Sequence, residues 1–519
     1  MSLSRRGFMA AAALGAAASA TGGFAAHAEP HAVAPGELDY QRLTLRGYNR
    51  RFVAQPKRIH IPSDTGELRD AVARSVRDDL RLAIRSGGHC FDDFVDSTDT
   101  RSLIDLQRLN TVGWDEQHNA FSVGAGADLD AVYRGLSRWG VTIPGGICRA
   151  VGVGGHISGG GYGPLSRQFG LVADHLYGVE IVTVDARGES SLMVATKDGP
   201  HRDLWWANTG GGGGNFGVVS RFLLRSPDSD GTDPTLALPR RPDSVLVGRL
   251  LLPMPMVTEE SFVRFLGNYL DFYARYREPG NRFAGLYARL IFRPLIEGFA
   301  DLLIFSYGPA RDAQSQLDEF LATVTDGVTP APVLLPPARL SYADSIEQYY
   351  APPTNPSRVK IKAAMLRQPY SPEQLRILYR ALIGLTVNGE SFVEFAPFGG
   401  AINATAPDAT AMPARDSFMK MLIHATWRDP GDDDRFISWA RTTYGNIYAD
   451  TGAAPVPDDR NGGSYINYPD PDLADPVWNT STTPWHALYY GANYTRLQRI
   501  KAEWDPKNIF RHRLSIEPH

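Results

Sequence analysis

The sequence predicts a mixed chain of the α+β or α/β class, folded as two or three domains. Its 519 residues are 43% hydrophobic and 21% charged, a globular composition on a chain too long for one hydrophobic core. Short runs with strand-like alternation are interleaved with segments of helical spacing. Residues 226–244 form a largely polar stretch with four prolines, which predicts a domain boundary.

The part before this boundary is rich in strand signals. Residues 81–85 and 179–184 predict strands, and the turn after the second predicts that residues 191–195 pair with it. Residues 129–139 have helical spacing. The apolar face of that helix would comprise Leu129, Val132, Leu136 and Trp139. Strands and helices therefore alternate in this first domain.

The part after the boundary, about 245–485, predicts a second domain of sheet and helices. Strands are expected at residues 286–292 and 301–307, and helices at residues 313–325 and 372–383. A tail from about residue 493 predicts an amphipathic helix that ends near Asp505 and Pro506, followed by an extended end.

The N-terminal sequence predicts an export signal. Arg5 and Arg6 precede an alanine-rich apolar stretch, and Ala26-His27-Ala28 matches an A-x-A cleavage site. The paired arginines favour the twin-arginine route over an ordinary secretory signal, which is the alternative. We therefore expect residues 1–28 to be removed and the mature protein to be periplasmic or secreted. The net charge of −4 does not suggest a nucleic-acid or anionic-membrane partner.

Three glycine-rich blocks are the main chemical signal in the chain. They lie at residues 86–88, 144–163 and 210–217. Glycine at this density lets the backbone approach a ligand and point N–H groups at it, as phosphates require. Tight turns explain single glycines well, but three blocks within 132 residues are harder to explain that way.

Several nucleotide and catalytic motifs are excluded. The pattern G-x-G-x-x-G occurs at residues 212–217, but a strand-like run follows it, whereas a Rossmann site must open a helix. The sequence contains no P-loop, no G-x-S-x-G elbow and no His/Cys/acid cluster at metal-ligand spacing, so we expect no metal site.

Several motifs together resemble a known family. They are Arg85-Ser86-Gly87-Gly88-His89, Cys148-x-x-Val151-Gly152-Val153-Gly154-Gly155-His156, Gly159-Gly160-Gly161-Tyr162-Gly163, Gly170-Leu171-x-x-Asp174, Tyr465-Ile466-Asn467-Tyr468 and Trp504-Asp505-Pro506-x-Asn508-x-Phe510-Arg511. In these motifs the chain is similar to the berberine-bridge-enzyme-like flavoproteins of the vanillyl-alcohol-oxidase superfamily. The resemblance covers essentially the whole mature chain and, within the family, is closest to bacterial oxidases of glycosylated or polyketide natural products.

The resemblance implies an α+β fold in three parts. A two-lobed FAD-binding domain would span residues 38–235, and a substrate domain with an antiparallel sheet covered by helices would span residues 245–485. The segment 490–519 would return to the FAD domain. Besides the two attachment sites, the residues expected to bind the cofactor are Arg85, Ser86, Gly87, Gly88, Val151, Gly152, Gly154, Gly155, His156, Gly159, Gly160, Asn467 and Asn508.

The resemblance also implies that FAD is attached twice. His89 would bond to the flavin 8α-methyl group, and Cys148 would bond to C6. The alternative is a single disulfide between Cys90 and Cys148, the two cysteines of the chain, with His89 in a turn.

The family places the catalytic base at a tyrosine of the Y-x-N motif, which here is Tyr465, with Tyr162 as a second active-site tyrosine. Since the pKa of tyrosine is about 10, holding it ionised at pH 7 requires roughly 4 kcal/mol from neighbouring groups. Tyr468 is a rival base. If residues 464–468 form a regular strand, Tyr465 and Asn467 share one face and Tyr468 points away. Glu394 could face either the pocket or solvent.

The expected reaction is alcohol oxidation with oxygen as the acceptor and hydrogen peroxide as a product. Val151 stands where the family has valine in oxygen-reactive members. An alternative enzymatic function is an oligosaccharide or hexose oxidase that yields a lactone. An alternative of another class is a flavin-carrying protein that binds a metabolite without turnover. The aromatic side chains of Tyr349, Tyr350, Trp427 and Trp478 suit sugars or aromatic polycycles equally. The oligomeric state is not predicted.

Overall fold

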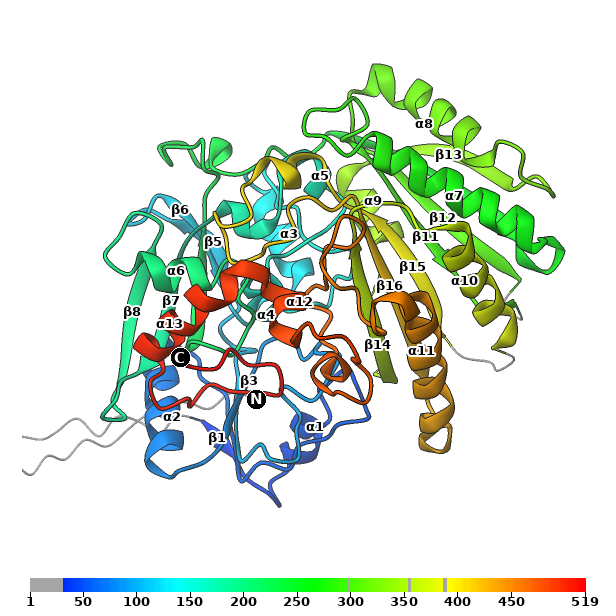
Figure 1. Cartoon of the computed structure of the whole chain (residues 1–519). Helices are drawn as coiled ribbons and strands as arrows, with labels where there is room; N and C mark the ends of the chain where they lie inside the picture. Colours follow the sequence, from blue (N-terminus) through cyan, green and yellow to red (C-terminus); the bar gives the residue numbers. More distant parts are fainter. Residues whose placement is uncertain (1–30, 296–297, 353–355, 386–389) are drawn as a thin grey trace, which may run out of the picture.

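The computed structural model describes residues 31–295, 298–352, 356–385 and 390–519. The predicted signal peptide, residues 1–28, lies outside the described residues. Three β-sheets with helices packed on them make up the chain, and most strand pairs are antiparallel (Figure 1). The α+β prediction is therefore confirmed, and the α/β alternative is not, because parallel pairing is confined to one small sheet.

The first lobe of the N-terminal domain holds the small sheet. In spatial order its strands are β1 Ala32–Val33, β2 Arg58–His60, β4 Ser102–Asp105 and β3 Leu82–Arg85. The helices are α1 Tyr40–Thr44 and α2 Thr65–Arg77. Helix α2 begins where the Asp64 carboxylate accepts a hydrogen bond from the Glu67 N–H, which satisfies a free donor of the first turn. The strand predicted at residues 81–85 is β3, and the first glycine block follows it directly.

The second lobe holds a five-stranded antiparallel sheet. In spatial order its strands are β5 Val112–Asp115, β6 Ala120–Gly124, β9 Val218–Leu224, β7 Leu176–Val184 and β8 Ser190–Thr196. The helical elements are α3 Leu129–Ser137, α4 Val153–Ser158, α5 Ser166–Phe169, the 3-10 helix η1 Val172–His175, and α6 Arg202–Ala207. The predicted pairing of residues 179–184 with 191–195 is confirmed as β7 with β8.

One residue of the predicted helix 129–139 is misplaced. Helix α3 ends at Ser137, so Trp139 does not belong to its buried face. The Trp139 side chain is 38% exposed and touches the Phe121 ring edge-on. The reason is the chain reversal at Gly140, which takes up a left-handed φ of 74° and carries the backbone away from the helix axis.

The second domain is one seven-stranded antiparallel sheet with four long helices on one face (Figure 1). In spatial order its strands are β13 Val333–Ser341, β10 Ser244–Pro253, β12 Phe299–Ser306, β11 Leu286–Phe292, β15 Phe392–Pro397, β16 Met419–Trp427 and β14 Arg358–Leu366. The long helices are α7 Glu259–Arg275, α8 Ala310–Thr325, α10 Pro372–Gly384 and α11 Asp433–Ile447, with the shorter α9 Tyr342–Tyr349. The strands predicted at 286–292 and 301–307 are β11 and β12, and the predicted helices are α8 and α10.

The two faces of this sheet differ because side chains alternate along each strand. On β16, Met421, Ile423 and Ala425 join the apolar core. Lys420 and His424, at the alternate positions, line a cavity on the opposite face. The helices therefore cover an apolar face, and the other face brings polar side chains toward the N-terminal domain.

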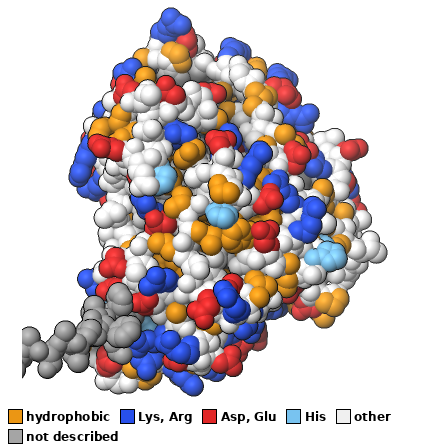
Figure 2. All heavy atoms as spheres, turned by 90° about the vertical axis from the view of Figure 1, so that its left-hand side faces the viewer, with side chains coloured by type: hydrophobic (Ala, Val, Ile, Leu, Met, Phe, Trp, Pro, Cys, Tyr) orange, Lys and Arg blue, Asp and Glu red, His pale blue; other side chains and the backbone are white. Residues whose placement is uncertain are grey.

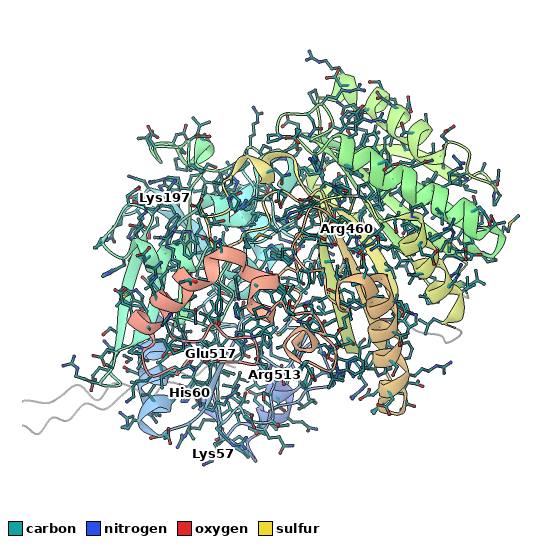
Figure 3. The ribbon with its side chains drawn as sticks, viewed as in Figure 1. Lys57, His60, Lys197, Arg460, Arg513 and Glu517 are labelled. Atoms are coloured by element: carbon teal, nitrogen blue, oxygen red, sulfur yellow. The ribbon has the colours of Figure 1, made fainter. Side chains whose placement is uncertain are left out.

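The C-terminal segment runs back over the N-terminal domain. It consists of α12 Trp485–Tyr490, α13 Tyr494–Trp504 and an extended tail. The buried Lys501 ammonium donates to the Asn215 carbonyl at 2.7 Å, and the Ile516 N–H donates to the Asn215 side chain at 3.0 Å. Figure 3 labels Arg513 and Glu517 in this tail, beside the lobe that carries Lys57 and His60.

The surface of the described chain is mixed in character. On the face shown in Figure 2, acidic, basic and apolar side chains are interspersed. Among the residues that the structure describes, no helix has both the length and the apolarity to cross a lipid bilayer.

Candidate active site

A cavity of about 430 Å³ lies where both lobes of the N-terminal domain meet the sheet of the second domain. We call it the central cavity. All three glycine-rich blocks of the sequence contribute to its wall, at residues 86–88, 146–163 and 212–217. The sheet contributes alternate residues of β11, β15 and β16, and the chain around residues 465–469 closes a further side.

The first two glycine blocks are in direct backbone contact. A Cβ atom on Gly87 would lie 2.4 Å from the Gly152 nitrogen, and one on Gly152 would lie 2.1 Å from the Gly87 nitrogen. The Ser86 hydroxyl ties the blocks together, because it donates to the Ala125 carbonyl at 2.6 Å and accepts from the Gly154 N–H at 3.2 Å. Only glycine fits at these two positions, and the bare backbone is left facing the cavity.

His89 and Cys148 approach each other across one end of the cavity. The Cys148 sulfur lies 3.6 Å from Nε2 of His89, and both Cys90 and Cys148 are free thiols. The alternative of a Cys90–Cys148 disulfide is therefore wrong. Burial lowers the pKa of His89 to about 4, so its imidazole is neutral near pH 7, with a ring that stacks on Tyr48 at 4.4 Å between centroids.

Tyr465 lies on a turn and not on a strand. The Tyr468 N–H donates to the Tyr465 carbonyl at 2.8 Å, so the condition that residues 464–468 form a regular strand is not met. As a result Tyr465, Asn467 and Tyr468 all line the central cavity. The Tyr465 hydroxyl oxygen accepts two hydrogen bonds, from the Gly161 N–H at 3.0 Å and from the Asn467 amide at 2.9 Å.

A buried cation stands beside this turn. The Lys420 ammonium donates to the Tyr468 hydroxyl at 2.8 Å and lies 5.3 Å from the centre of the Tyr162 ring. Burial raises the pKa of Tyr465, and Tyr468 adds to the rise; the hydrogen bonds from Asn467 and Gly161 and the charge of Lys420 oppose it. These opposing groups are the ones that stabilise a phenolate.

Glu394 faces the cavity and not solvent. Its carboxylate pairs with the Arg289 guanidinium at 2.6 Å and with the Lys420 ammonium at 2.8 Å. Burial alone would raise the pKa of Glu394, but these two cations hold it at about 2. Glu394 is therefore ionised near neutral pH, and its role is to neutralise buried positive charge, not to take a proton.

Family profiles match two parts of the chain. Residues 56–190 match the "FAD binding domain" profile, and residues 464–517 match the "Berberine and berberine like" profile. The second match contains the turn of Tyr465 and the C-terminal tail.

Individual proteins match along almost the whole length. Aclacinomycin-N/aclacinomycin-A oxidase of Streptomyces galilaeus is 43% identical over 92% of this chain and 88% of its own. The chain belongs to the berberine-bridge-enzyme-like family of FAD-linked oxidoreductases. A flavoenzyme of caerulomycin biosynthesis superposes with a TM-score of 0.92 at 44% identity, covering 95% of this chain and 100% of that one. A glycopeptide hexose oxidase solved with teicoplanin superposes with a TM-score of 0.90 at 41% identity, covering 95% and 99%.

The central cavity suits the FAD of this family. A Cβ on Gly155, which lines the cavity, would meet no protein atom within 4 Å and would take up cavity space, and the same cavity receives an unpartnered polar atom, Nε2 of His512, from the C-terminal tail. The His512 ring stacks on Phe94 at 3.9 Å. The residues that would hold the flavin are therefore those of the first two glycine blocks, together with the residues of the third block and the tail.

Most residues predicted from the berberine-bridge-enzyme-like pattern line the central cavity. They are Arg85, Ser86, Gly87, Gly88, His89, Cys148, Val151, Gly152, Gly154, Gly155, His156, Tyr162, Tyr465 and Asn467. Two of them are anchored away from it by their polar ends. The Arg85 guanidinium pairs with buried Asp105 at 2.9 Å, and the Tyr162 hydroxyl donates to the Pro397 carbonyl at 2.5 Å.

Three predicted cofactor residues are not among those that line the cavity. Gly159 and Gly160 lie behind it: a Cβ on Gly159 would meet the Asn467 side chain at 2.1 Å, and one on Gly160 would meet Met412 at 3.3 Å. Asn508 lies in the tail with a φ of 51°, and its amide donates to Glu517 at 3.3 Å. These residues shape the turn and the tail and do not face the cavity.

The four aromatic residues considered for substrate stacking also lie outside the cavity wall. Tyr350 bonds to Tyr307, Trp427 stacks on Phe436, and Trp478 lies under Arg441. The cavity instead receives Tyr287, Arg289, Phe392, Lys420 and His424, which the sequence reasoning missed. The sequence does contain a signal for these residues. Polar residues at alternate positions of an otherwise apolar strand indicate that one face of the strand borders a polar cavity.

Proposed function

We propose that this protein is an oxidase that carries FAD on two covalent bonds, to His89 and Cys148, and oxidises an alcohol group of a glycosylated or polyketide metabolite. The observation that carries the proposal is the 3.6 Å approach of His89 Nε2 and Cys148 Sγ in a cavity whose other wall holds Tyr465. The similarity to aclacinomycin oxidase supports the substrate class.

The attachment to both residues is supported by their surroundings. His89 is neutral, because burial lowers its pKa to about 4, and a neutral imidazole is the form that can form a bond to carbon. Cys148 has no disulfide partner, is half-buried and lines the same cavity. Cys90 is also half-buried and lines the cavity, but burial raises the pKa of its thiol to about 12, so Cys90 is kept protonated. Burial raises the pKa of Cys148 as well, but there the backbone at Ala150 and the charges of Arg289 and Arg149 oppose the rise.

Tyr465 is the residue placed to accept the proton of the substrate hydroxyl. Its oxygen takes hydrogen bonds from Gly161 and Asn467, both of which persist when the oxygen is ionised. Lys420 adds a positive charge held close by through Tyr468. Hydrogen bonds to a charged oxygen are stronger than those to a neutral one, so this arrangement favours proton acceptance by Tyr465.

Oxygen is the proposed final acceptor. When bound, the flavin supplies a two-electron acceptor that dioxygen reoxidises to give hydrogen peroxide. Val151, the residue by which the family resemblance favours oxygen, lies half-buried in the cavity wall three residues after Cys148. Its short side chain leaves more room than leucine would at the same place.

A hexose or oligosaccharide oxidase that gives a lactone is the second candidate. The glycopeptide hexose oxidase at 41% identity favours it, as does the polar Arg289–Glu394 pair in the cavity wall. The two candidates are separated by peroxide release with free sugars against release with glycosylated aromatic metabolites. If no alcohol gives turnover while the flavin is bound and photoreducible, the protein is instead a flavin-carrying binding protein.

The attachment is tested by absorption spectra of the purified protein before and after acid precipitation. We expect the yellow colour to stay with the pellet in the wild type and in each of His89→Ala and Cys148→Ala, and to leave only in the double variant. Cys90→Ala is the matched control and should behave as wild type. Flavin released from the wild type into the supernatant would contradict the proposal.

Export by the twin-arginine route remains part of the proposal. It rests on the Arg5-Arg6 pair and the alanine-rich stretch that follows. Replacing both arginines with lysine in the native host should leave the flavoprotein, with its cofactor, inside the cell. Continued export of that variant would point to another route.

A further inference from the structure

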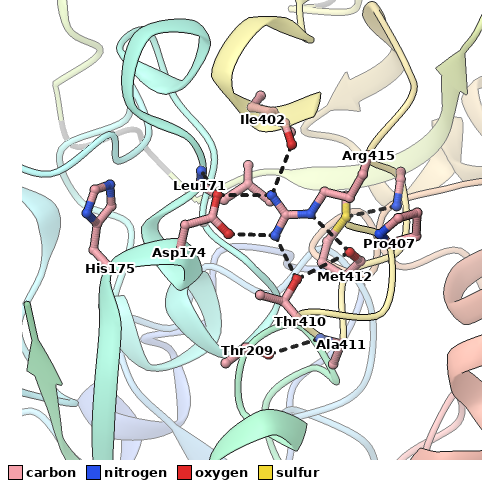
Figure 4. A network of polar contacts seen from close by, with 12 residues as sticks. Leu171, Asp174, His175, Thr209, Ile402, Pro407, Thr410, Ala411, Met412 and Arg415 are labelled. Carbon is pink, nitrogen blue, oxygen red and sulfur yellow. Dashed lines mark hydrogen bonds and ion pairs between the residues drawn. The ribbon is translucent and has the colours of Figure 1, made fainter. Parts of the chain in front are cut away.

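A bidentate ion pair joins the two domains (Figure 4). The Arg415 guanidinium meets the Asp174 carboxylate with Nη2–Oδ1 at 2.7 Å and Nη1–Oδ2 at 3.0 Å. Asp174 lies on η1 of the N-terminal domain, and Arg415 lies in the loop that follows the 3-10 helix Gly400–Ala404 of the second domain. The Arg415 side chain is 1% exposed, so this charge is fully withdrawn from water.

Arg415 also organises its own loop. Its guanidinium donates to the Thr410 hydroxyl at 2.6 Å and to the Met412 carbonyl at 3.3 Å (Figure 4). The Ala411 N–H in turn donates to the Thr209 hydroxyl at 2.9 Å. These hydrogen bonds hold the loop against the N-terminal domain. Met412 of this loop packs against Gly160, where an added Cβ would lie 3.3 Å from the Met412 side chain.

Asp174 holds the other side of the same glycine segment. Its carboxylate accepts from the Leu171 N–H at 2.8 Å and so caps η1. The first N–H groups of that helix donate to the glycine segment, Val172 to the Gly161 carbonyl at 2.9 Å and Ala173 to the Gly160 carbonyl at 2.8 Å. The carbonyls of both glycines are thus fixed to the helix that the ion pair anchors.

The N–H of the same Gly161 donates to the Tyr465 hydroxyl at 3.0 Å. Gly161 has a left-handed φ of 72°, and a Cβ there would lie 2.7 Å from Cβ of Val172, so the segment has no room to shift toward η1. A continuous set of contacts therefore runs from Arg415 through Asp174 and η1 to the donor that touches the proposed base.

We propose that Arg415 and Asp174 are positioning residues, whose ion pair holds the Gly161 N–H against the Tyr465 oxygen while that oxygen takes the substrate proton. This inference rests on the proposed role of Tyr465. It differs from a plain structural role, because loss of the pair should change how the rate depends on pH and not only how stable the protein is.

The direction of the change follows from the hydrogen bond. A donor to an ionised oxygen stabilises the ionised form, so a displaced Gly161 N–H should raise the pH at which Tyr465 becomes an effective base. The other titratable or charged groups around this site are unchanged by the variants below. They are Tyr468, Lys420 with its partners Glu394 and Arg289, Tyr162 with Tyr287, and His156. Buried His175, which follows Asp174 on η1, is the exception, because the Asp174 charge raises its pKa and Asp174→Asn removes that charge.

The test compares flavin-loaded wild type with Asp174→Asn, Arg415→Lys and Arg415→Met in kcat/KM against pH, with an alcohol substrate found by peroxide release. We expect the acid limb to move up by about one pH unit in Arg415→Met, with about tenfold lower kcat/KM at pH 7, and by less in Arg415→Lys, which keeps the charge. Amide hydrogen exchange over residues 159–175 should be faster in the same order.

Glu347→Gln is the matched control. Glu347 on α9 pairs with Arg149 at 2.8 Å and so also joins the two domains, but away from Tyr465. It should leave both the pH profile and the exchange of residues 159–175 unchanged. If Arg415→Met does not fold, Asp174→Asn and Arg415→Lys decide the question.

Tyr465→Phe separates the two proposals. In that background, which lacks the hydroxyl, Arg415→Lys should cause no further loss of rate, whereas independent effects would multiply. If Tyr465→Phe keeps wild-type activity, the proposed role of Tyr465 as the base fails, and the positioning inference fails with it. If Tyr465→Phe is impaired but the Asp174 and Arg415 variants have the same kcat/KM as wild type at every pH, only the positioning inference is overturned.

Discussion

The Lys420 ammonium lies 2.8 Å from the hydroxyl oxygen of Tyr468, within a cavity wall that is otherwise mostly aromatic and apolar. The cation is not free, because Glu394 pairs with it at 2.8 Å and Arg289 pairs with Glu394 in turn. The three charges leave one net positive charge beside the tyrosine turn. In a buried site such a charge favours the ionised form of a neighbouring phenol.

Removing this charge should weaken the base. In Lys420→Met we expect kcat/KM at pH 7 to fall by about 10-fold or more and its acid limb to move to higher pH, since about one pKa unit corresponds to a tenfold change. Lys420→Arg keeps a cation and should lose less. The measurement is oxygen consumption against pH at matched flavin content. Equal pH profiles of kcat/KM for Lys420→Met and Lys420→Arg would show that the positive charge at this position does not set the strength of the base.

The identity of the base is tested by two single hydroxyl deletions. Tyr465→Phe should lower kcat by roughly 10²–10⁴-fold, the usual contribution of a positioned proton acceptor. Tyr468→Phe should cost less, because its hydroxyl receives a hydrogen bond from Lys420 and serves to hold that cation. Peroxide release under saturating substrate measures both. A larger loss in Tyr468→Phe would assign the base to Tyr468 instead.

Two glycine-to-alanine substitutions in the cavity wall should have different effects on stability and flavin binding. Gly87→Ala puts a Cβ 2.4 Å from the Gly152 nitrogen, so we expect a lower melting temperature and loss of flavin. Gly155→Ala has no protein atom within 4 Å of the new Cβ and lines the cavity, so it should fold normally and bind less flavin. Gly113→Ala, also with open space at its Cβ, is the control. Thermal unfolding and the ratio of flavin to protein absorbance measure each outcome.

Buried His60 predicts a loss of stability in acid. Both ring nitrogens of His60 lack a partner, and burial together with Arg74 and Arg58 lowers its pKa to about 4. Since the folded value lies below the unfolded value of about 6.5, the unfolded chain binds the proton more tightly. The stability tied to neutral His60 is present above pH 6.5 and is lost as the pH falls toward 4, by up to about 3 kcal/mol.

The check is the melting temperature of His60→Leu against wild type from pH 7.5 to 4. The difference between the two should move in favour of the variant as the pH falls, because leucine cannot be protonated. Other buried histidines, such as His156 and His424, titrate in both proteins and cancel in this difference. A difference that stays constant with pH would mean that His60 does not titrate in this range.

Local patterns predicted much of the secondary structure. The run Leu286–Phe292 is strand β11 with the bounds expected, because its apolar and β-favouring residues need only neighbouring strands to be satisfied. Helix α10 begins at Pro372, where Ser371 and Gln374 form a capping box that is readable in the sequence. Helix α3 was overextended to Trp139, since the chain reversal at Gly140 depends on what the segment packs against.

The site was predicted less evenly. Motif positions placed His89, Cys148, Tyr162 and Asn467 at one cavity, but Asn508 and Gly160 were assigned to its wall from their motifs alone. Whether a residue faces a ligand depends on the path of the backbone. At Tyr465 that path is a turn, which brings Tyr468 to the same side as Asn467, contrary to the strand geometry considered.

The sequence by itself determined the chemistry that this protein can hold: glycines where backbones must touch, a histidine and a cysteine at attachment positions, and a tyrosine motif. Those features act through residues close in the chain or through types that no other residue replaces. Only the tertiary structure decided that Lys420, Arg289 and Glu394 surround the tyrosine turn and that Arg415 anchors Asp174. These contacts join segments up to 241 residues apart, and their charges are stabilised only when folding buries them together.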